Sequence, residues 1–150
     1  MSKKECINEL KFQIPSYSSN EASSRAIVSA FCAALNPTVE ELSDIKCAVS
    51  EAVTNSTVHG YRDMIGTITI DVKLYSDRSL KIDIKDKGCG IENIEQALQP
   101  LYTTDPEGER SGMGFTVMEN FMDSMSVKST VGRGTKVTMR KKLSALPMKK

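Results

Sequence analysis

The clearest hydrophobic pattern in the chain lies between Ile45 and His59. Apolar residues recur there at the i, i+3, i+4, i+7 and i+8 spacing of a helix that packs one face on a core, at Ile45, Ala48, Val49, Ala52 and Val53. Glu51 and Asn55 are four residues apart, so they lie one above the other at the edge of this apolar stripe. Such a pair is either an ordinary solvated flank or a carboxylate and an amide that reach into a cleft.

The residues before this central helix predict one strand and one helix. Alternating apolar positions indicate a strand over residues 7–14, at Leu10, Phe12 and Ile14. A helix is expected to follow as far as Leu35, begun by a capping box of Ser18 and Glu21 or, alternatively, by Asn20. We expect its core stripe to consist of Ala26, Ile27, Ala30, Phe31, Ala34 and Leu35.

Both ends of the central helix carry recognisable signals. Thr38 and Glu41 have the spacing of a capping box at its start. Gly60 is its expected C-terminal cap, because glycine adopts a left-handed conformation without steric cost. His59 lies in the last turn, where a helix C-terminus favours a cation, and we interpret it as structural.

Two strands with strict alternation follow, over residues 67–74 and 80–86, and residues 76–79 form the turn between them. Asp86 is in phase with the apolar positions of the second strand, Leu80, Ile82 and Ile84. If the strand continues, Asp86 faces the core, where a carboxylate is costly unless it is hydrogen-bonded. If the strand ends one residue earlier, Asp86 is only a turn residue.

The rest of the chain predicts two helical segments and two strands. The expected elements are a short helical segment over 91–99, an irregular loop over 100–112, a helix over 114–125 and strands over 126–130 and 135–141. Thr135 is in phase with Val137 and Met139, so it should face inward.

The predicted order of elements is β-α-α-β-β-(α)-loop-α-β-β. Hairpins require antiparallel pairing, and the helices are partly segregated from the strands. We therefore expect an α+β fold, a two-layer sandwich whose mixed, mainly antiparallel sheet is covered on one face by helices. The length of 150 residues predicts a single domain over residues 1–150, with a frayed tail over about 144–150.

Composition excludes several classes of function. The net charge of +1 gives no electrostatic basis for direct binding to nucleic acid or to an anionic membrane. The four cysteines form no C-x-x-C pair, and with one histidine in the chain a zinc site is not expected. No stretch has the length and hydropathy of a membrane span or the form of a signal peptide, so we expect a cytoplasmic protein.

Candidate chemistry is distributed over four segments of the chain. The amide oxygen of Asn55 suits Mg²⁺, and an inward Asp86 could accept from an exocyclic amino group. The glycine-rich stretch over residues 108–114 opens directly into a helix, whose unpaired backbone N–H groups suit phosphate. Arg110 could add a charge-assisted contact to a terminal phosphate.

Four motifs in these segments resemble the conserved boxes of the GHKL ATP-binding family, which includes gyrase, Hsp90 chaperones, histidine kinases and MutL. They are EAVTN (51–55), DKGCGI (86–91), ERSGMGFTVMENFMD (109–123) and GT (134–135). The likeness covers about residues 18–137 and is stronger to the anti-sigma factor kinases within that family. No upstream dimerisation helix with a phosphoacceptor histidine is present, which disfavours a histidine-kinase fragment.

The resemblance implies the GHKL (Bergerat) fold and a protein serine kinase that uses ATP and Mg²⁺. It implies that Glu51 is the general base, that Arg110 approaches the γ-phosphate, that Asn55 binds Mg²⁺, and that Asp86 reads adenine with help from Thr135 through water. The other implied nucleotide-binding residues are Gly88, Gly90, Ile91, Thr103, Thr104, Ser111, Gly112, Met113 and Gly114.

The resemblance also implies partners. These are a sporulation sigma factor, which the protein inhibits, and an anti-anti-sigma factor, which it phosphorylates on serine; Arg25 would contact both, and a homodimer is implied. Two alternatives stay open: a nucleotide-gated sigma-binding module without useful kinase activity, and a stress-response anti-sigma kinase of the same family. Asp105 departs from the family pattern, which often has lysine in this loop.

Overall fold

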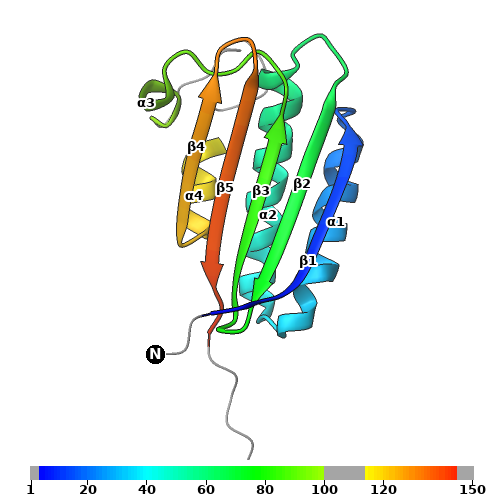
Figure 1. The fold of residues 1–150 in the computed structure, drawn as a ribbon, viewed down its shortest axis with the longest axis vertical. Coiled ribbons are helices and arrows are strands. Elements are labelled where there is room, and N and C mark those ends of the chain that lie inside the picture. The colour runs from blue at the N-terminus through cyan, green and yellow to red at the C-terminus, as the bar shows by residue number, and fades with distance from the viewer. Residues whose placement is uncertain (1–3, 100–113, 145–150) are drawn as a thin grey trace, which may run out of the picture.

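Alternating apolar and polar residues build a five-stranded sheet in the computed structural model, which describes residues 4–99 and 114–144. The strands follow the order β1-β2-β3-β5-β4, and every pairing in the described residues is antiparallel (Figure 1). Their bounds are Cys6–Pro15 (β1), Thr67–Tyr75 (β2), Ser79–Asp86 (β3), Ser124–Thr130 (β4) and Gly134–Lys142 (β5).

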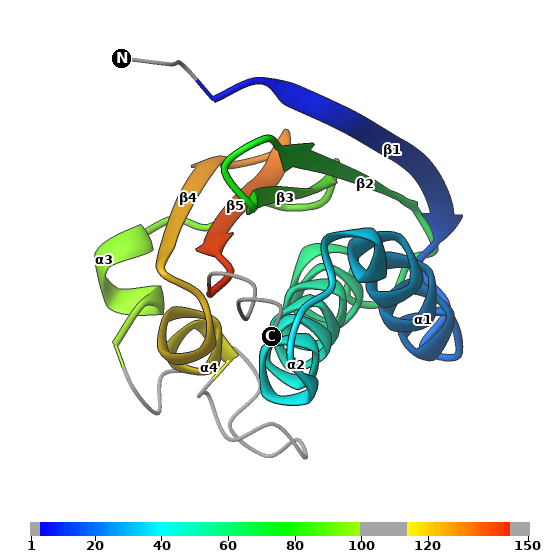
Figure 2. The ribbon, with the colours of Figure 1, turned by 90° about the horizontal axis from the view of Figure 1, so that it is seen from below.

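Helices cover one face of this sheet. They are α1 (Asn20–Cys32, continued by a 3₁₀ turn over Ala33–Leu35), α2 (Val39–Asn55, continued by a π turn over Ser56–Gly60) and α4 (Gly114–Phe121). The short α3 (Ile94–Ala97) lies beyond the edge strand β4 (Figure 1). Figure 2 shows α1, α2 and α4 side by side beneath the sheet, with α2 between the other two. The expected two-layer α+β sandwich is therefore confirmed.

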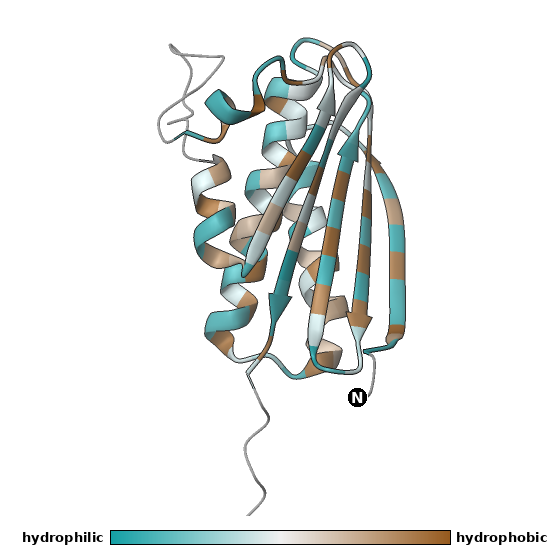
Figure 3. Cartoon of the chain, turned by 60° about the vertical axis from the view of Figure 1, so that its left-hand side comes forward, coloured by the Kyte–Doolittle hydropathy of each residue, from teal (hydrophilic) through white to brown (hydrophobic). Residues whose placement is uncertain are grey.

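The core lies between α2 and the central strands. The five apolar positions predicted for α2 are all buried, and so are the inward positions of β2 and β3: Ile68, Ile70, Val72, Leu74, Leu80, Ile82 and Ile84. Figure 3 shows the strands banded by alternating apolar and polar residues. Each fully buried aliphatic side chain stabilises the fold by about 1.5–3 kcal/mol. The packing of α2 on the β2–β3 hairpin is therefore a large part of the stability of the fold.

The start of α2 follows the sequence prediction, whereas its end does not. Thr38 Oγ1 accepts from the backbone N–H of Glu41 over 3.0 Å, and Glu41 Oε1 accepts from the N–H of Thr38 over 2.9 Å. The helix does not stop at a left-handed Gly60; it widens into a π turn, in which the N–H of Tyr61 donates to Ser56 O over 3.0 Å. This widening carries Ser56 to β3.

The predicted core stripe of this helix is confirmed for Leu35, which is buried, and for Phe31, which packs against the core, and it is wrong for the other four positions. Ala26, Ile27, Ala30 and Ala34 are exposed, and the helix buries Ser24, Val28, Ser29 and Cys32, with Leu35 beyond it. The hydroxyl of Ser24 donates to Asn20 O over 2.7 Å, which removes most of the cost of burying a serine. The N-cap is Ser19 without a side-chain hydrogen bond, and Asn20 donates instead to Pro15 O, so the expected capping box is absent.

The boundary between α4 and β4 also lies earlier than expected. The helix ends at Phe121, and β4 begins at Ser124, so Met125 belongs to the strand. The N–H of Asp123 donates to Arg140 O over 2.9 Å, and Lys141 Nζ donates to Phe121 O over 2.8 Å. Pairing with β5 therefore ends the helix. No helix in the described residues is long and apolar enough to cross a membrane.

Candidate functional site

Asp86 is the last residue of β3, and its carboxylate is buried, with 4% of the residue exposed. The strand does run on to this residue, which decides between the two alternatives left by the sequence. Oδ1 accepts from the backbone N–H of Gly88 over 2.9 Å and of Thr135 over 3.3 Å. Oδ2 accepts from Ser56 Oγ over 2.9 Å. Three segments of the chain thus meet at this one side chain.

Burial raises the pKa of the Asp86 carboxyl above its ordinary value, and the hydrogen bonds from Gly88, Ser56 and Thr135 oppose that rise. An ionised carboxylate has about four lone-pair sites, and the protein fills three of them. The remaining capacity suits one further donor, such as an exocyclic amino group. The acceptor that Asp86 still offers therefore fits the amino group of adenine.

A second hydrogen-bond network lies beside Asp86. Thr135 faces inward as predicted, and its Oγ1 lies 2.8 Å from Ser129 Oγ. Ser129 Oγ also accepts from the backbone N–H of Ile91 over 2.7 Å. The network fixes the chain on both sides of the carboxylate: Thr135 at the start of β5 and Ile91 in the segment after β3.

Ser56 and Ser129 were not predicted as site residues. A signal for Ser129 existed, because it is in phase with the inward Val127 of the same strand. No comparable signal existed for Ser56, which reaches Asp86 only because α2 widens into the π turn.

The glycines after Asp86 are required by packing. A Cβ on Gly88 would lie 2.1 Å from Gly60 O, and a Cβ on Gly90, which has a φ of +78°, would lie 2.4 Å from Thr130 O. The backbone N–H of Cys89 donates to Gly60 O over 2.9 Å. The loop after β3 is therefore clamped between the π turn and the β4–β5 turn, which holds Asp86 in place.

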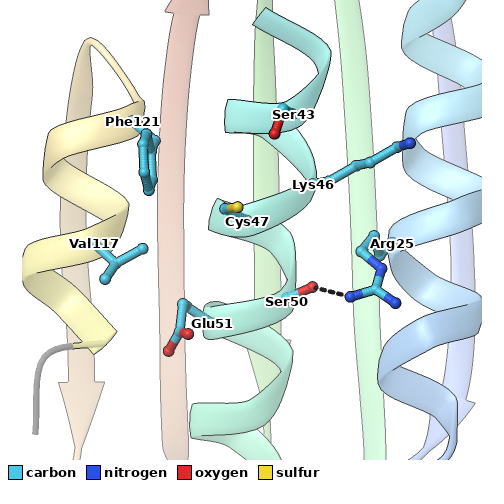
Figure 4. Close-up of a pocket in the computed structure, with 8 residues that line it drawn as sticks. All are labelled: Arg25, Ser43, Lys46, Cys47, Ser50, Glu51, Val117 and Phe121. Atoms are coloured by element: carbon cyan, nitrogen blue, oxygen red, sulfur yellow. Dashed lines mark hydrogen bonds between the residues drawn. The ribbon is translucent and has the colours of Figure 1, made fainter. Parts of the chain in front are cut away.

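Glu51 and Asn55 lie one helical turn apart on α2, as the sequence predicted. Glu51 lines a groove of about 490 Å³ on the outer side of the helical layer (Figure 4). Asn55 directly precedes Ser56, the hydrogen-bond donor to Asp86. The last turn of α2 and the π turn after it therefore carry Glu51, Asn55 and the hydrogen-bond donor to Asp86 within six consecutive residues.

Arg25 of α1 lines the same groove as Glu51. Its Nη1 lies 3.2 Å from Glu21 Oε1 and 3.5 Å from Ser50 Oγ, so the guanidinium is held against α2. The structure thus brings Arg25 and Glu51, 26 positions apart in the chain, to one surface.

Part of the predicted site lies outside the described residues. The predicted nucleotide-binding positions concerned are Thr103, Thr104, Arg110, Ser111, Gly112 and Met113. Gly114 is the first residue of α4, which packs beside α2. The expected phosphate contacts of this segment stay a prediction.

Comparison with known proteins identifies the family. The model of the histidine kinase-like ATPase domain matches residues 14–141. Among solved structures, the RsbU and RsbW domains of Rv1364c from Mycobacterium tuberculosis superpose with a TM-score of 0.66 at 18% identity, over 91% of this chain and 32% of that one. The mycobacterial sensor histidine kinase MprB superposes with a TM-score of 0.55 at 12% identity, over 90% of this chain and 100% of that one. These structures share the fold.

Curated relatives are much closer in sequence. The anti-sigma F factor of Clostridium acetobutylicum is 50% identical over 139 residues, which are 93% of this chain and 96% of that protein. The anti-sigma F factor of Thermoanaerobacter sp. is 53% identical over 137 residues, 91% of this chain and 95% of that protein. The chain therefore belongs to the histidine kinase-like ATPase family, in which its relatives at 50–53% identity are anti-sigma F factors.

Proposed function

We propose that this chain is an anti-sigma factor that binds and inhibits a sporulation sigma factor and uses ATP to phosphorylate a serine of its anti-anti-sigma antagonist. The proposal is supported by relatives named anti-sigma F factor that match more than nine-tenths of the chain. One structural observation carries the chemistry. Glu51 opens onto a surface groove, and one turn further along α2 Asn55 adjoins the residue that hydrogen-bonds to the buried Asp86.

Asp86 and Asn55 are the described residues that would hold the nucleotide. Asp86 accepts from the adenine amino group, Thr135 fixes the carboxylate through its backbone N–H, and Ile91 borders the base. Asn55 contributes an oxygen ligand for Mg²⁺. Mg²⁺ bound with ATP supplies charge neutralisation for phosphoryl transfer.

Glu51 acts as the general base. Its carboxylate takes the proton from the incoming serine hydroxyl, a role that typically contributes about 10²–10⁴-fold to the rate. Arg25 contacts the partner proteins from the other side of the groove. Positioning and charge neutralisation supply the rest of the catalysis in this reaction class, to which Arg110 contributes by the family resemblance.

We further propose a single domain that works in the cytoplasm as a homodimer. Size-exclusion chromatography with light scattering measures the dimer directly, and a monomer at micromolar concentration would contradict it.

The experiment that tests the kinase mixes the protein with γ-labelled Mg·ATP and the anti-anti-sigma protein of the same organism. We expect label on one serine of that partner. Glu51→Gln should keep ATP affinity and lose transfer by at least about 10²-fold. Glu40→Gln, at an exposed position of the same helix, is the matched control and should transfer normally.

Other outcomes would redirect the proposal. A protein that binds ATP and the sigma factor but labels no partner would be a nucleotide-gated binding module. Normal transfer by Glu51→Gln would remove the base assignment. Co-purification of the bound sigma factor distinguishes a sporulation sigma factor from a stress-response one.

A further inference from the structure

The groove beside Glu51 has a floor and two walls. Its floor is the outer face of α2, and its walls are α1 on one side and α4 on the other. The lining residues are Arg25, Ser43, Lys46, Cys47, Ser50, Glu51, Val117 and Phe121. Its volume of about 490 Å³ lies within the range of pockets that hold ligands. Glu51 is one of eight described residues that line this space, so the groove offers contacts beyond the Glu51 carboxylate itself.

Lys46 is a positive charge in this groove that is not paired with any residue in 4–99 or 114–144. Arg25, the neighbouring cation, is engaged by Glu21 and Ser50. Lys46 is exposed and makes no hydrogen bond or ion pair with any residue that the structure describes. Figure 4 shows Lys46 on the side of α2 that faces α1 and Glu51 on the side that faces α4.

Two carboxylates close to Lys46 in sequence, those of Asp44 and Glu41, interact with other groups. Asp44 Oδ2 lies 3.6 Å from Lys141 Nζ, and Glu41 closes the capping box of α2. The groove therefore presents the Lys46 ammonium group, which has no anionic partner among the described residues. The carboxylate of Glu51, the proposed base for the serine hydroxyl, lines the same groove. A cation of this kind attracts an acidic side chain of an incoming protein.

We propose that the groove holds the serine-bearing segment of the antagonist in an extended conformation, and that Lys46 pairs with an acidic residue of that segment. The inference rests on the proposed kinase function. Lys46 and Glu51 are five positions apart on α2, which corresponds to about 7.5 Å along the helix axis. Their side chains lie on opposite flanks of the helix (Figure 4). An extended chain advances about 3.3 Å per residue. The acidic residue should therefore lie about three positions from the serine.

The test measures phosphorylation kinetics with the antagonist protein as the substrate. Lys46→Glu should raise KM for that protein about tenfold, with kcat and ATP affinity close to those of the wild type. Lys46→Arg should keep the wild-type KM. Lys136→Glu is the matched control, because Lys136 is an exposed residue of β5 whose neighbours Thr135 and Val137 are the buried, inward positions of that strand.

Charge exchange provides the decisive readout. Each acidic residue within four positions of the labelled serine is replaced by lysine in turn. One of these substrates should be poor with the wild type and restored with Lys46→Glu. This restoration cannot come from a merely structural role of Lys46.

Each contrary result has its own meaning. An unchanged KM for Lys46→Glu, or no restoring partner, overturns the inference while the kinase proposal stands. Weakened sigma-factor binding with an unchanged KM also overturns it and assigns Lys46 to the other partner. If the wild type labels no serine, the proposed function fails and this inference fails with it.

Discussion

Ser56 Oγ donates a hydrogen bond to Asp86 Oδ2 over 2.9 Å, and this contact joins the end of the central helix to the end of β3. Both groups are buried. The contact exists because α2 continues as a π turn, a feature that often marks functional sites in helices. Asn55, the proposed metal ligand, is the residue immediately before Ser56, so one junction positions both proposed nucleotide contacts.

Asp86→Asn should fold and lose ATP binding. The amide oxygen keeps the hydrogen bonds from the backbone N–H groups of Gly88 and Thr135, and Ser56 can reverse its hydroxyl to accept from the amide nitrogen. The amide does not offer the carboxylate's remaining acceptor capacity to an adenine amino group. Calorimetry should show at least about 10²-fold weaker ATP binding with a native circular dichroism spectrum.

Asp83→Asn is the control for this variant. It lies on the same strand but on the open face, where its Oδ1 accepts from Thr138 Oγ1 over 2.5 Å. Its ATP affinity should equal that of the wild type. Wild-type affinity in Asp86→Asn would remove Asp86 from the nucleotide site.

The stability of the protein should depend on pH through Asp86. Because burial raises the pKa of this carboxyl in the folded state, its contribution is fully present below the unfolded value of about 3.9 and is lost as pH rises through the folded pKa. The free energy of unfolding of the wild type minus that of Asp86→Asn should therefore fall as pH rises above about 4. Urea titrations at several pH values measure it, and a difference that rises with pH would contradict the sign.

Asn55→Ala should remove the Mg²⁺-dependent part of ATP binding. The variant deletes the one oxygen ligand that this position offers, whereas Asn55→Asp keeps an oxygen and should retain the dependence. Titration of ATP with Mg²⁺ and with EDTA separates the two contributions. Equal Mg²⁺ dependence in the wild type and Asn55→Ala would exclude the metal role.

Gly90→Ala should destabilise the fold more than Gly132→Ala. Both glycines have nearly the same positive φ, +78° and +79°, so both variants carry a similar backbone strain of about 1–2 kcal/mol. A Cβ on Gly90 would also lie 2.4 Å from Thr130 O, whereas none of the described atoms lies within 4 Å of one on Gly132. Overpacking should add about 1–3 kcal/mol to the loss in Gly90→Ala, measured by urea unfolding. Equal losses would show that the loop after β3 shifts freely.

Cys32 should be inert in the folded protein. Burial raises the pKa of its thiol to about 12, and the thiolate is the reactive form. Cys6 and Cys47 are exposed and should react first with iodoacetamide at pH 8. Mass spectrometry of the digested protein should find Cys32 alkylated only under unfolding conditions. Early labelling of Cys32 would mean that α1 opens locally.

The alternation and periodicity of the sequence identified those features of the site that follow from one element alone. The helical period placed Glu51 and Asn55 on one edge of α2, and the period of two placed Thr135 on the inner side of its strand and put Asp86 in phase with the inner positions of β3, provided that the strand continued to it. These statements need only the geometry of a helix or a strand. The motifs at the same positions indicated the family, which the comparisons confirm.

The face of α1 could not be read in the same way. Small apolar residues occur almost all round this helix, and it buries two serines whose hydroxyls bond to their own backbone. Hydropathy assigns serine to the surface, so the pattern found Phe31 and Leu35 but chose exposed alanines and Ile27 in place of Ser24 and Ser29. The choice of face was made by packing against α2, which no local signal encodes.

The sequence by itself therefore determined the order of elements, the inward Thr135 and the Glu51–Asn55 edge, because each depends on local geometry; whether Asp86 faces inward was decided by how far β3 runs. The tertiary structure decided which groups surround them. Ser56 reaches Asp86 through the π turn, Gly88 and Gly90 pack against distant backbone, and Arg25 and Lys46 share a groove with Glu51. These contacts join residues far apart in the chain, and they form only when the helices pack on the sheet.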